Sequence, residues 1–233
     1  MLLFADSSSL SPDLVRMTSI LIGMAFLPFL LGMLTSFAKI VVVCGILRQG
    51  LGLQQVPPTS VLTGLALILT ITIMAPVATD AWNGVQALEE KTLSPEASRA
   101  VREPIEEFLT RGLSEGKALA VFSRDRALEG EELRLDGLTP EVRAEARAWS
   151  ALLTKTAPSF LLQELSEAFV IGFLLLIPFL VLDLVVGNVL LSLGMMMMSP
   201  QVVSLPLKIL LFVSVDGWEL LLGGLVENYA PSP

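Results

Sequence analysis

The sequence has no histidine and only one cysteine, Cys44, among its 233 residues. It therefore lacks a disulfide framework and the clusters of ligands that hold zinc, haem or iron–sulfur groups. A serine protease with a histidine base is excluded for the same reason. Charged residues make up only 16% of the chain, and a net charge of -8 lacks the basic excess of nucleic-acid-binding proteins. We expect no metal, no cofactor and no nucleic-acid partner, and Cys44, in an apolar run, is expected to pack as an inert side chain.

Hydrophobic residues are abundant, at 53% of the chain, and the mean hydropathy is +0.73. This composition is too apolar for an ordinary soluble domain and predicts an integral membrane protein. Residues 1–16 show no basic region ahead of their short apolar start. The sequence therefore predicts no cleaved signal peptide.

Charge is distributed unevenly along the chain. Between Asp80 and Lys155 lie 15 of the 23 acidic and 11 of the 15 basic residues. A polar, water-facing insert therefore separates two apolar halves. From the N-terminus, the sequence predicts an N-terminal segment 1–16, a first apolar helical pair 17–79, an extracytoplasmic helical insert 80–157, a second apolar pair with the methionine-rich loop 158–227 and a tail 228–233.

Each apolar half predicts two helices, over 17–47 and 59–79 and over 160–193 and 202–226. Helices at 17–47 and 160–193 exceed the roughly 20 residues that cross a bilayer. Pro28 and Pro178 interrupt these two segments, and Pro200 follows the third, so we expect kinks or helical hairpins there. In the insert, SPEASRAVREP and TPEVRAEARAW each place proline at a first helical position and mixed charges at helical spacing. The fold class is thus all-α.

Charged side chains inside the apolar segments need partners. The deep bases are Lys39 and Lys208. The deep acids are Glu164, Glu167 and Asp183. Glu164 and Glu167 are three residues apart on a helix and can present a paired acceptor to one lysine. Either ion pairs fix the register of helices or subunits, or the charges form a proton or cation path.

An intramembrane aspartyl protease is a weaker alternative, built on Asp183 and Asp216 on successive apolar segments. Neither aspartate lies in a GxGD context. Asp216 and Glu219 are instead expected near a helix end that water reaches. We therefore predict no catalytic residues.

Four consecutive methionines, Met195 to Met198, lie between Gly194 and Pro200. One interpretation is filler at a helix end. The other requires several copies around an axis, where soft methionine side chains would form a deformable apolar ring that closes a channel. The sequence alone favours neither.

Long stretches of both apolar halves resemble a known family. They are TSFAKIVVVCGILRQGLGLQQVPPTSVLTGLALILTITIMAPV, QELSEAFVIGFLLLIPFLVLDLVVGNVLLSLGMMMMSP and SLPLKILLFVSVDGWELLLGGLV. They resemble the FliP/SctR family, the export-gate protein of type III secretion systems. The charged insert is the unmatched part.

The resemblance implies a cone-shaped helical pore of five copies, assembled with FliQ/SctS-type and FliR/SctT-type subunits in the bacterial inner membrane and projecting to the periplasmic side. Unfolded substrates would pass through it. The resemblance also implies a methionine gasket at Met195, Met196, Met197 and Met198. It implies subunit-bridging charges at Lys39, Glu164 and Lys208. The N-terminus favours the injectisome branch over the flagellar one.

The sequence therefore predicts a non-enzymatic pore subunit of an export gate. The rival interpretation is an ion-coupled secondary transporter or channel subunit. Its midplane site would be formed by the acidic and basic residues Lys39, Glu164, Glu167 and Asp183.

Overall fold

The computed structural model describes residues 12–53, 56–86, 94–113 and 139–229. Helices account for most of these residues, and no strand occurs among them. The predicted all-α fold is confirmed. The predicted segments 1–16 and 80–157 lie partly outside the described residues, as does the tail 228–233.

The first apolar half consists of α1 (Pro12–Leu34), α2 (Phe37–Gly50) and α3 (Thr59–Gln86). The segment predicted as one helix over 17–47 is broken between α1 and α2 by a bend of 87°. The break lies at Thr35 and Ser36, whereas α1 continues through Pro28. Helix α3 continues beyond residue 79, so the first part of the predicted polar insert extends an apolar helix.

The described part of the insert contains α4 (Pro95–Gly112) and α6 (Pro140–Ala151). Both helices begin as predicted. Ser94 and Thr139 accept hydrogen bonds from the backbone N–H three residues later, and proline follows each as the first helical residue.

A long helix organises the second half. Helix α6 continues through a π-helical turn, Leu152–Thr156, into α7 (Ala157–Ser192), so that residues Pro140–Ser192 form one 53-residue helix. Helix α7 continues through Pro178. It ends at Ser192, and Gly194, two residues further on, has a positive φ of 76° that allows the Met195 N–H to donate to the Leu190 carbonyl.

The segment predicted as one helix over 202–226 is divided into α8 (Pro200–Ser214) and α9 (Gly217–Glu227), bent by 58°. Asp216, with a positive φ of 51°, forms the junction. It is exposed there, as is Glu219 in the first turn of α9, so both lie near a helix end as predicted, and access of water to them stays a prediction.

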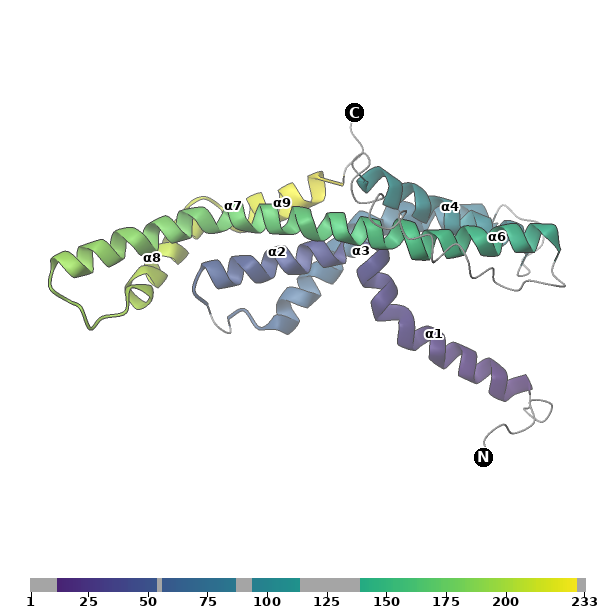
Figure 1. Cartoon of the computed structure of the whole chain (residues 1–233), viewed down its shortest axis with the longest axis horizontal. Coiled ribbons are helices and arrows are strands. Elements are labelled where there is room, and N and C mark those ends of the chain that lie inside the picture. Colours follow the sequence, from purple (N-terminus) through teal and green to yellow (C-terminus); the bar gives the residue numbers. More distant parts are fainter. Residues whose placement is uncertain (1–11, 54–55, 87–93, 114–138, 230–233) are drawn as a thin grey trace.

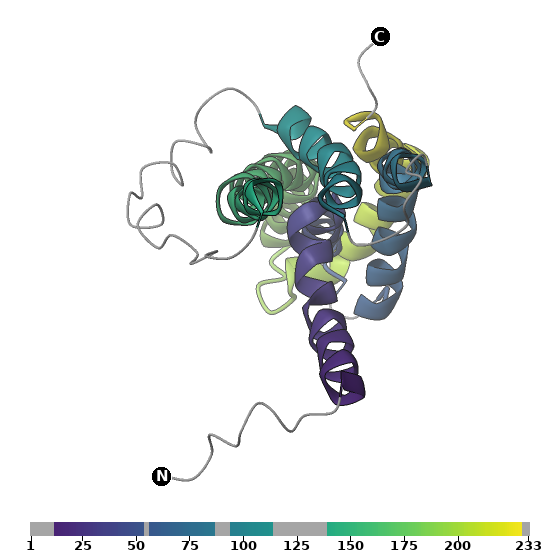
Figure 2. The same ribbon diagram turned by 90° about the vertical axis from the view of Figure 1, so that its right-hand side faces the viewer.

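Figure 1 shows the long helix running the length of the molecule, with the insert helices near one end and α8 near the other. Helix α2 lies along α7. Their contact is close because Gly172 has no side chain: a Cβ there would approach the Ile46 side chain to 2.4 Å. In two views α1 leaves the body as an arm (Figures 1 and 2).

Two groups of buried apolar residues hold these helices together. The larger joins α2, α3, α7, α8 and α9 and includes the fully buried Cys44, as expected. The smaller group, around Leu109, Leu152 and Phe160, joins the insert to α7. Met33 and Leu34, in the last turn of α1, pack against it. The insert is therefore packed onto the apolar part of the chain.

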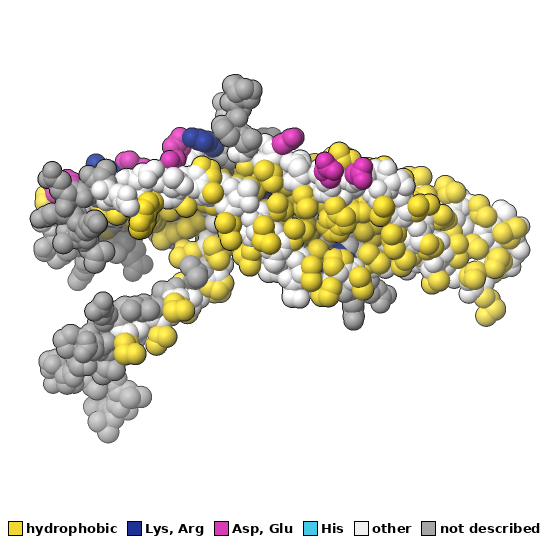
Figure 3. Space-filling view, turned by 180° about the vertical axis from the view of Figure 1, so that it is seen from behind, with side chains coloured by type: hydrophobic (Ala, Val, Ile, Leu, Met, Phe, Trp, Pro, Cys, Tyr) yellow, Lys and Arg dark blue, Asp and Glu magenta, His cyan; other side chains and the backbone are white. Residues whose placement is uncertain are grey.

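Much of the surface remains apolar. Figure 3 shows hydrophobic side chains over the α7–α8 half and acidic side chains along one edge. Within the described residues, α3 and the Pro140–Ser192 helix are long and apolar enough to cross a membrane, and two bent pairs would add one crossing each if they span as units. The fold is that of a membrane-type helical protein.

Candidate functional site: buried ion pairs and the methionine loop

The first buried ion pair forms where α2 lies along α7. The Lys39 ammonium, 1% exposed, is 3.2 Å from the Glu164 carboxylate and 2.7 Å from that of Glu167. Glu164 is equally buried, whereas the Glu167 side chain is 41% exposed and also accepts a hydrogen bond from Gln163 at 3.0 Å. The two glutamates share one helix face, so a single lysine pairs with both.

Tyr229, just beyond α9, completes this cluster. Its hydroxyl donates to Glu164, and the Lys39 ammonium lies 4.7 Å from its ring centroid. Its ring also stacks on Phe108 of α4, with centroids 6.0 Å apart. Burial raises the pKa of the Tyr229 phenol, and the charge of Glu164 and the hydrogen bond to it raise that pKa further. The cluster therefore connects α2, α4, α7 and the residues just after α9.

The second ion pair joins α7, α8 and the C-terminus of α2. The buried Lys208 ammonium is 2.6 Å from the Asp183 carboxylate and donates to the Gly50 carbonyl at 3.1 Å. Gly50 is the last residue of α2, where a positive charge is favoured by the helix dipole. Ser204 also donates to Asp183. Asp183 thus has a lysine partner, while Asp216 lies at the exposed α8–α9 junction.

A third ion cluster, which the sequence interpretation missed, holds the two insert helices together. The Arg102 guanidinium of α4 donates a hydrogen bond to the Glu145 carboxylate of α6 at 2.8 Å and also forms an ion pair with Glu106. The hydrogen bond to Glu145 raises the pKa of Arg102, as does the charge of Glu145. Trp149 donates to Ser98 across the same contact at 2.8 Å. The sequence places Arg102 and Glu145 among many other exposed charges, so no local pattern singles them out.

The methionine loop connects α7 to α8 at the end of the molecule opposite the insert (Figure 1). Met196 is 80% and Met197 103% exposed, whereas Met195 and Met198 are about half-exposed. Pro200 is the first residue of α8, so the break predicted at this position falls at the end of the loop. No contact within the described part of the chain covers the two central side chains.

The described residues contain no group of three or more His, Cys, Asp or Glu that could hold a metal ion. All the deep charges predicted from the sequence are paired within this one chain, Lys39 with Glu164 and Glu167 and Lys208 with Asp183. The fold and these clusters define a helical membrane-type protein whose deep charges are held in ion pairs between helices. The chain belongs to the FliP family, which matches residues 20–225.

Relatives of two kinds share this similarity. The flagellar biosynthetic protein FliP of Caulobacter vibrioides is 40% identical over 224 residues, which cover 95% of this chain and 79% of that protein. The Yop proteins translocation protein R of Yersinia pestis is 39% identical over 94% of this chain and 97% of its own length. The hypersensitivity response secretion protein HrcR of Ralstonia nicotianae is 40% identical over 89% of this chain and 94% of that protein. The resemblance seen in the sequence is confirmed.

Proposed function

We propose that this chain is a core, non-enzymatic subunit of a type III secretion export gate, which forms the entry channel for unfolded protein substrates across the bacterial inner membrane. The observation that carries the proposal is the family match over residues 20–225. The names of the relatives, which refer to flagellar biosynthesis, translocation and secretion, support it. The assignment to the injectisome branch stays a prediction, since both kinds of relative are equally similar.

The apolar helices support a location in the inner membrane. A 53-residue helix is about 80 Å long, far more than the roughly 30 Å of a hydrocarbon core. Its polar end, with the insert, therefore extends well beyond the bilayer. We assign that projection to the periplasmic side.

The methionine loop is the part of the site that acts on the channel. Its side chains are exposed in the single chain, and several copies around an axis would bring the four methionines of each copy together. Such a ring is apolar and deformable, so it excludes water and ions when closed and yields to a passing chain. We propose that Met195 to Met198 form this gasket.

The ion pairs supply rigidity to the subunit. Lys39 and Glu164 join α2 to α7 across 125 residues of sequence, whereas Lys208 and Asp183 join the consecutive helices α7 and α8. Lys208 also donates to the carbonyl of Gly50, at the end of α2. These ion pairs hold the helices of one subunit in register and so define the surface offered to its neighbours. Five copies, with FliQ/SctS-type and FliR/SctT-type subunits, form the proposed complex. Energy for transport comes from other components, because the sequence has no nucleotide-binding motif.

The test of the proposal is the native mass of the complex, extracted gently in detergent after co-expression with the neighbouring membrane-protein genes. We expect five copies of this chain together with smaller membrane proteins. The same chain expressed alone is the matched control for what the partners contribute. A monomer or dimer without partners in the co-expressed sample contradicts the proposal.

A further inference from the structure

The methionine loop connects two helices whose apolar side chains are mostly exposed near it. Helix α7 ends at Ser192, α8 begins at Pro200, and α8 turns back toward α7 after the loop (Figure 1). Val186 and Leu190 of α7 are buried in this part. The other large apolar side chains are 53% to 70% exposed, among them those of Leu184, Val185, Val189, Leu191 and Val202. Apolar packing therefore gives α8 only a weak hold on α7 beside the loop.

A polar clasp, formed by Asp183 of α7 with Ser204 and Lys208 of α8, joins the two helices. Ser204 donates to one oxygen of the Asp183 carboxylate, and Lys208 donates to the other at 2.6 Å. Ser204 and Lys208 are both buried and, four residues apart, lie on one face of α8. Two contacts one helical turn apart fix the rotation of α8 as well as its distance from α7. The bond from Lys208 to the Gly50 carbonyl anchors the clasp to α2 as well.

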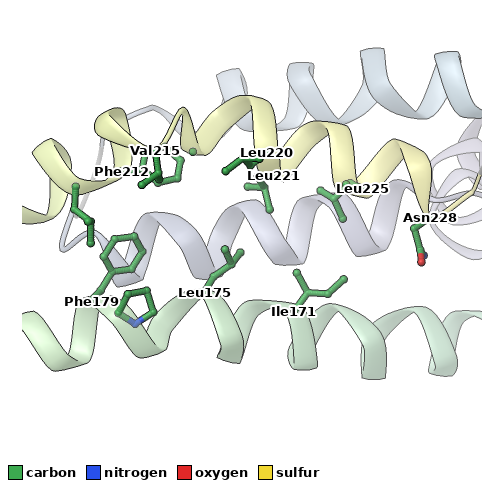
Figure 4. Close-up of a pocket in the computed structure, with 13 residues that line it drawn as sticks. Ile171, Leu175, Phe179, Phe212, Val215, Leu220, Leu221, Leu225 and Asn228 are labelled. Carbon is green, nitrogen blue, oxygen red and sulfur yellow. The ribbon is translucent and has the colours of Figure 1, made fainter.

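On the side of the clasp away from the loop, packing between the helices is interrupted again. Figure 4 shows a cavity of about 510 Å³ between α7 and the α8–α9 segment, with Leu175 and Leu221 on opposite walls. The rings of Phe179 and Phe212 lie at one end of this cavity, with centroids 6.5 Å apart. The clasp is therefore a fixed point between an exposed stretch on one side and a cavity on the other.

The clasp differs from the Lys39 cluster in its exposure. The Asp183 side chain is 26% exposed, whereas that of Glu164 is 2% exposed. Asp183 also borders a polar cavity of about 440 Å³, whose lining includes Arg48 and Gln201. A partly exposed carboxylate loses less when its partner leaves than a fully buried one does. Of the two ion pairs, the clasp is the one suited to open while the subunit stays folded.

We infer that Asp183 is a positioning residue for the methionine loop, because its clasp on α8 determines where the loop lies in the closed gate. Asp183 is nine residues, or about 14 Å, before the end of α7, and Ser204 is the fifth residue of α8. One end of the loop continues from the long α7, and the other leads into α8, whose place depends on the clasp. When the clasp opens, α8 moves and carries that end of the loop with it. The inference rests on the proposed function, since it takes Met195 to Met198 as the gasket.

Spin labels beside the loop test the inference in the co-expressed complex. The label is placed at Ser199→Cys in a Cys44→Ala background, because Ser199 is exposed, makes no capping hydrogen bond through its side chain and leaves all four methionines in place. Distances between labels on different copies report the diameter of the ring that the loops form, and dye release from vesicles reports the seal. The double variant Asp183→Ala/Lys208→Met removes the clasp and leaves no unpaired buried charge.

We expect the double variant to broaden the distribution of distances between loops and to raise dye release several-fold above that of the unaltered complex. Leu62→Ala is the matched control, since Leu62 of α3 is buried and its truncation lowers stability while the clasp and the loop stay intact. It should change neither readout. If the double variant does not assemble, Ser204→Ala removes one of the two clasp contacts and should give a smaller change in the same direction.

Unchanged distances in whichever clasp variant assembles overturn the inference, with or without leakage. Equal changes in Leu62→Ala also overturn it, since general loosening of the subunit would then explain them. Changed distances without dye release support the positioning role of Asp183 and count against the gasket. Absence of any multi-copy complex of the unaltered chain refutes the proposed function itself.

Discussion

Lys39 is almost fully buried, so the stability of the fold depends on keeping its charge paired with that of Glu164. Lys39→Met leaves the buried Glu164 carboxylate with only the Tyr229 hydroxyl as a partner. We expect the free energy of unfolding to fall by about 3 to 5 kcal/mol, because removing one partner leaves an uncompensated buried charge. Thermal unfolding in detergent, followed by circular dichroism, measures the loss.

The matched control is Glu167→Gln, since Glu167 contacts the same lysine but is 41% exposed. Its cost is expected to stay below about 1 kcal/mol. The double variant Lys39→Met/Glu164→Gln should recover part of the loss. A transporter with these charges in its ion path predicts a different result, in which Glu164→Gln abolishes transport and leaves folding and assembly intact.

Tyr229 is the only tyrosine in the chain, so its ionisation can be followed by absorbance at 295 nm. In the folded protein its pKa is raised by burial and by the charge of Glu164, so phenolate should be absent at pH values where the unfolded chain, with a pKa near 10, ionises. Because the folded state keeps a proton that the unfolded state releases, stability should fall as pH rises above about 10.

The control for this titration is Tyr229→Phe, which removes the absorbance change and keeps the ring on Phe108. Its stability should vary less with pH above about 10 than that of the original chain. Ionisation of Tyr229 near pH 10 in the folded protein would show that the phenol is in contact with water.

The sequence predicted which charged residues pair only where their spacing along a helix places them on one face. The i, i+3 spacing of Glu164 and Glu167 predicted a shared face, and scarcity of deep charges limited the choice of partners. Tyr229 was not predicted because its contact with Glu164 depends on how α9 folds back along α7, which no local pattern encodes.

At the scale of the helices, Gly172 lies at a close contact between α7 and α2. A side chain there would meet Ile46, with the new Cβ 2.4 Å from Cδ1 and 3.1 Å from Cβ. Gly172→Ala should therefore reduce the free energy of unfolding by about 1 to 3 kcal/mol, because the crowded helices must shift apart. The midpoint of thermal unfolding gives the readout.

Gly64→Ala in α3 is the matched control, since an added Cβ there meets nothing within 4 Å. Alanine is the better helix former, so this variant should be neutral or more stable by up to about 1 kcal/mol. Equal effects at the two positions would mean that the α2–α7 contact is looser than described.

Helix starts were predictable and helix breaks less so. Ser94 and Thr139 cap helices because capping needs only a side-chain oxygen and the next turn of backbone. The break between α1 and α2 was expected near Pro28 but lies at Thr35 and Ser36, where Leu34 on one side joins the packing around the insert. Thr35-Ser36 ahead of an apolar run is itself a helix-start signal. A proline inside a helix is the weaker indicator here.

For the whole assembly, the methionine loop gives the sharpest functional prediction. Replacing Met195 to Met198 together by serine should leave the number of subunits in the complex unchanged, because the two central side chains, Met196 and Met197, are 80% and 103% exposed and contribute little to the packing of the subunit. It should make the membrane leaky to ions or small solutes, measured by dye or ion release from vesicles that contain the complex. Leucine at the same four positions is the control, since it keeps the apolar surface.

An assembled complex with serine in the loop and no leak would show that other groups close the channel. Leakage from the leucine variant as well would point to the flexibility of methionine, rather than its apolar surface, as the property that the closed state needs.

The single helix from Pro140 to Ser192 has one more consequence. It starts in the insert, where Glu145 pairs with Arg102, and ends at Ser192, just before the methionine loop. A helix without a break acts as a stiff lever, so a tilt of the insert by a few degrees displaces its far end by several ångströms over a length of about 80 Å. Whatever binds the insert would therefore displace the methionine loop and, in the proposed assembly, change the diameter of the ring that the loops form.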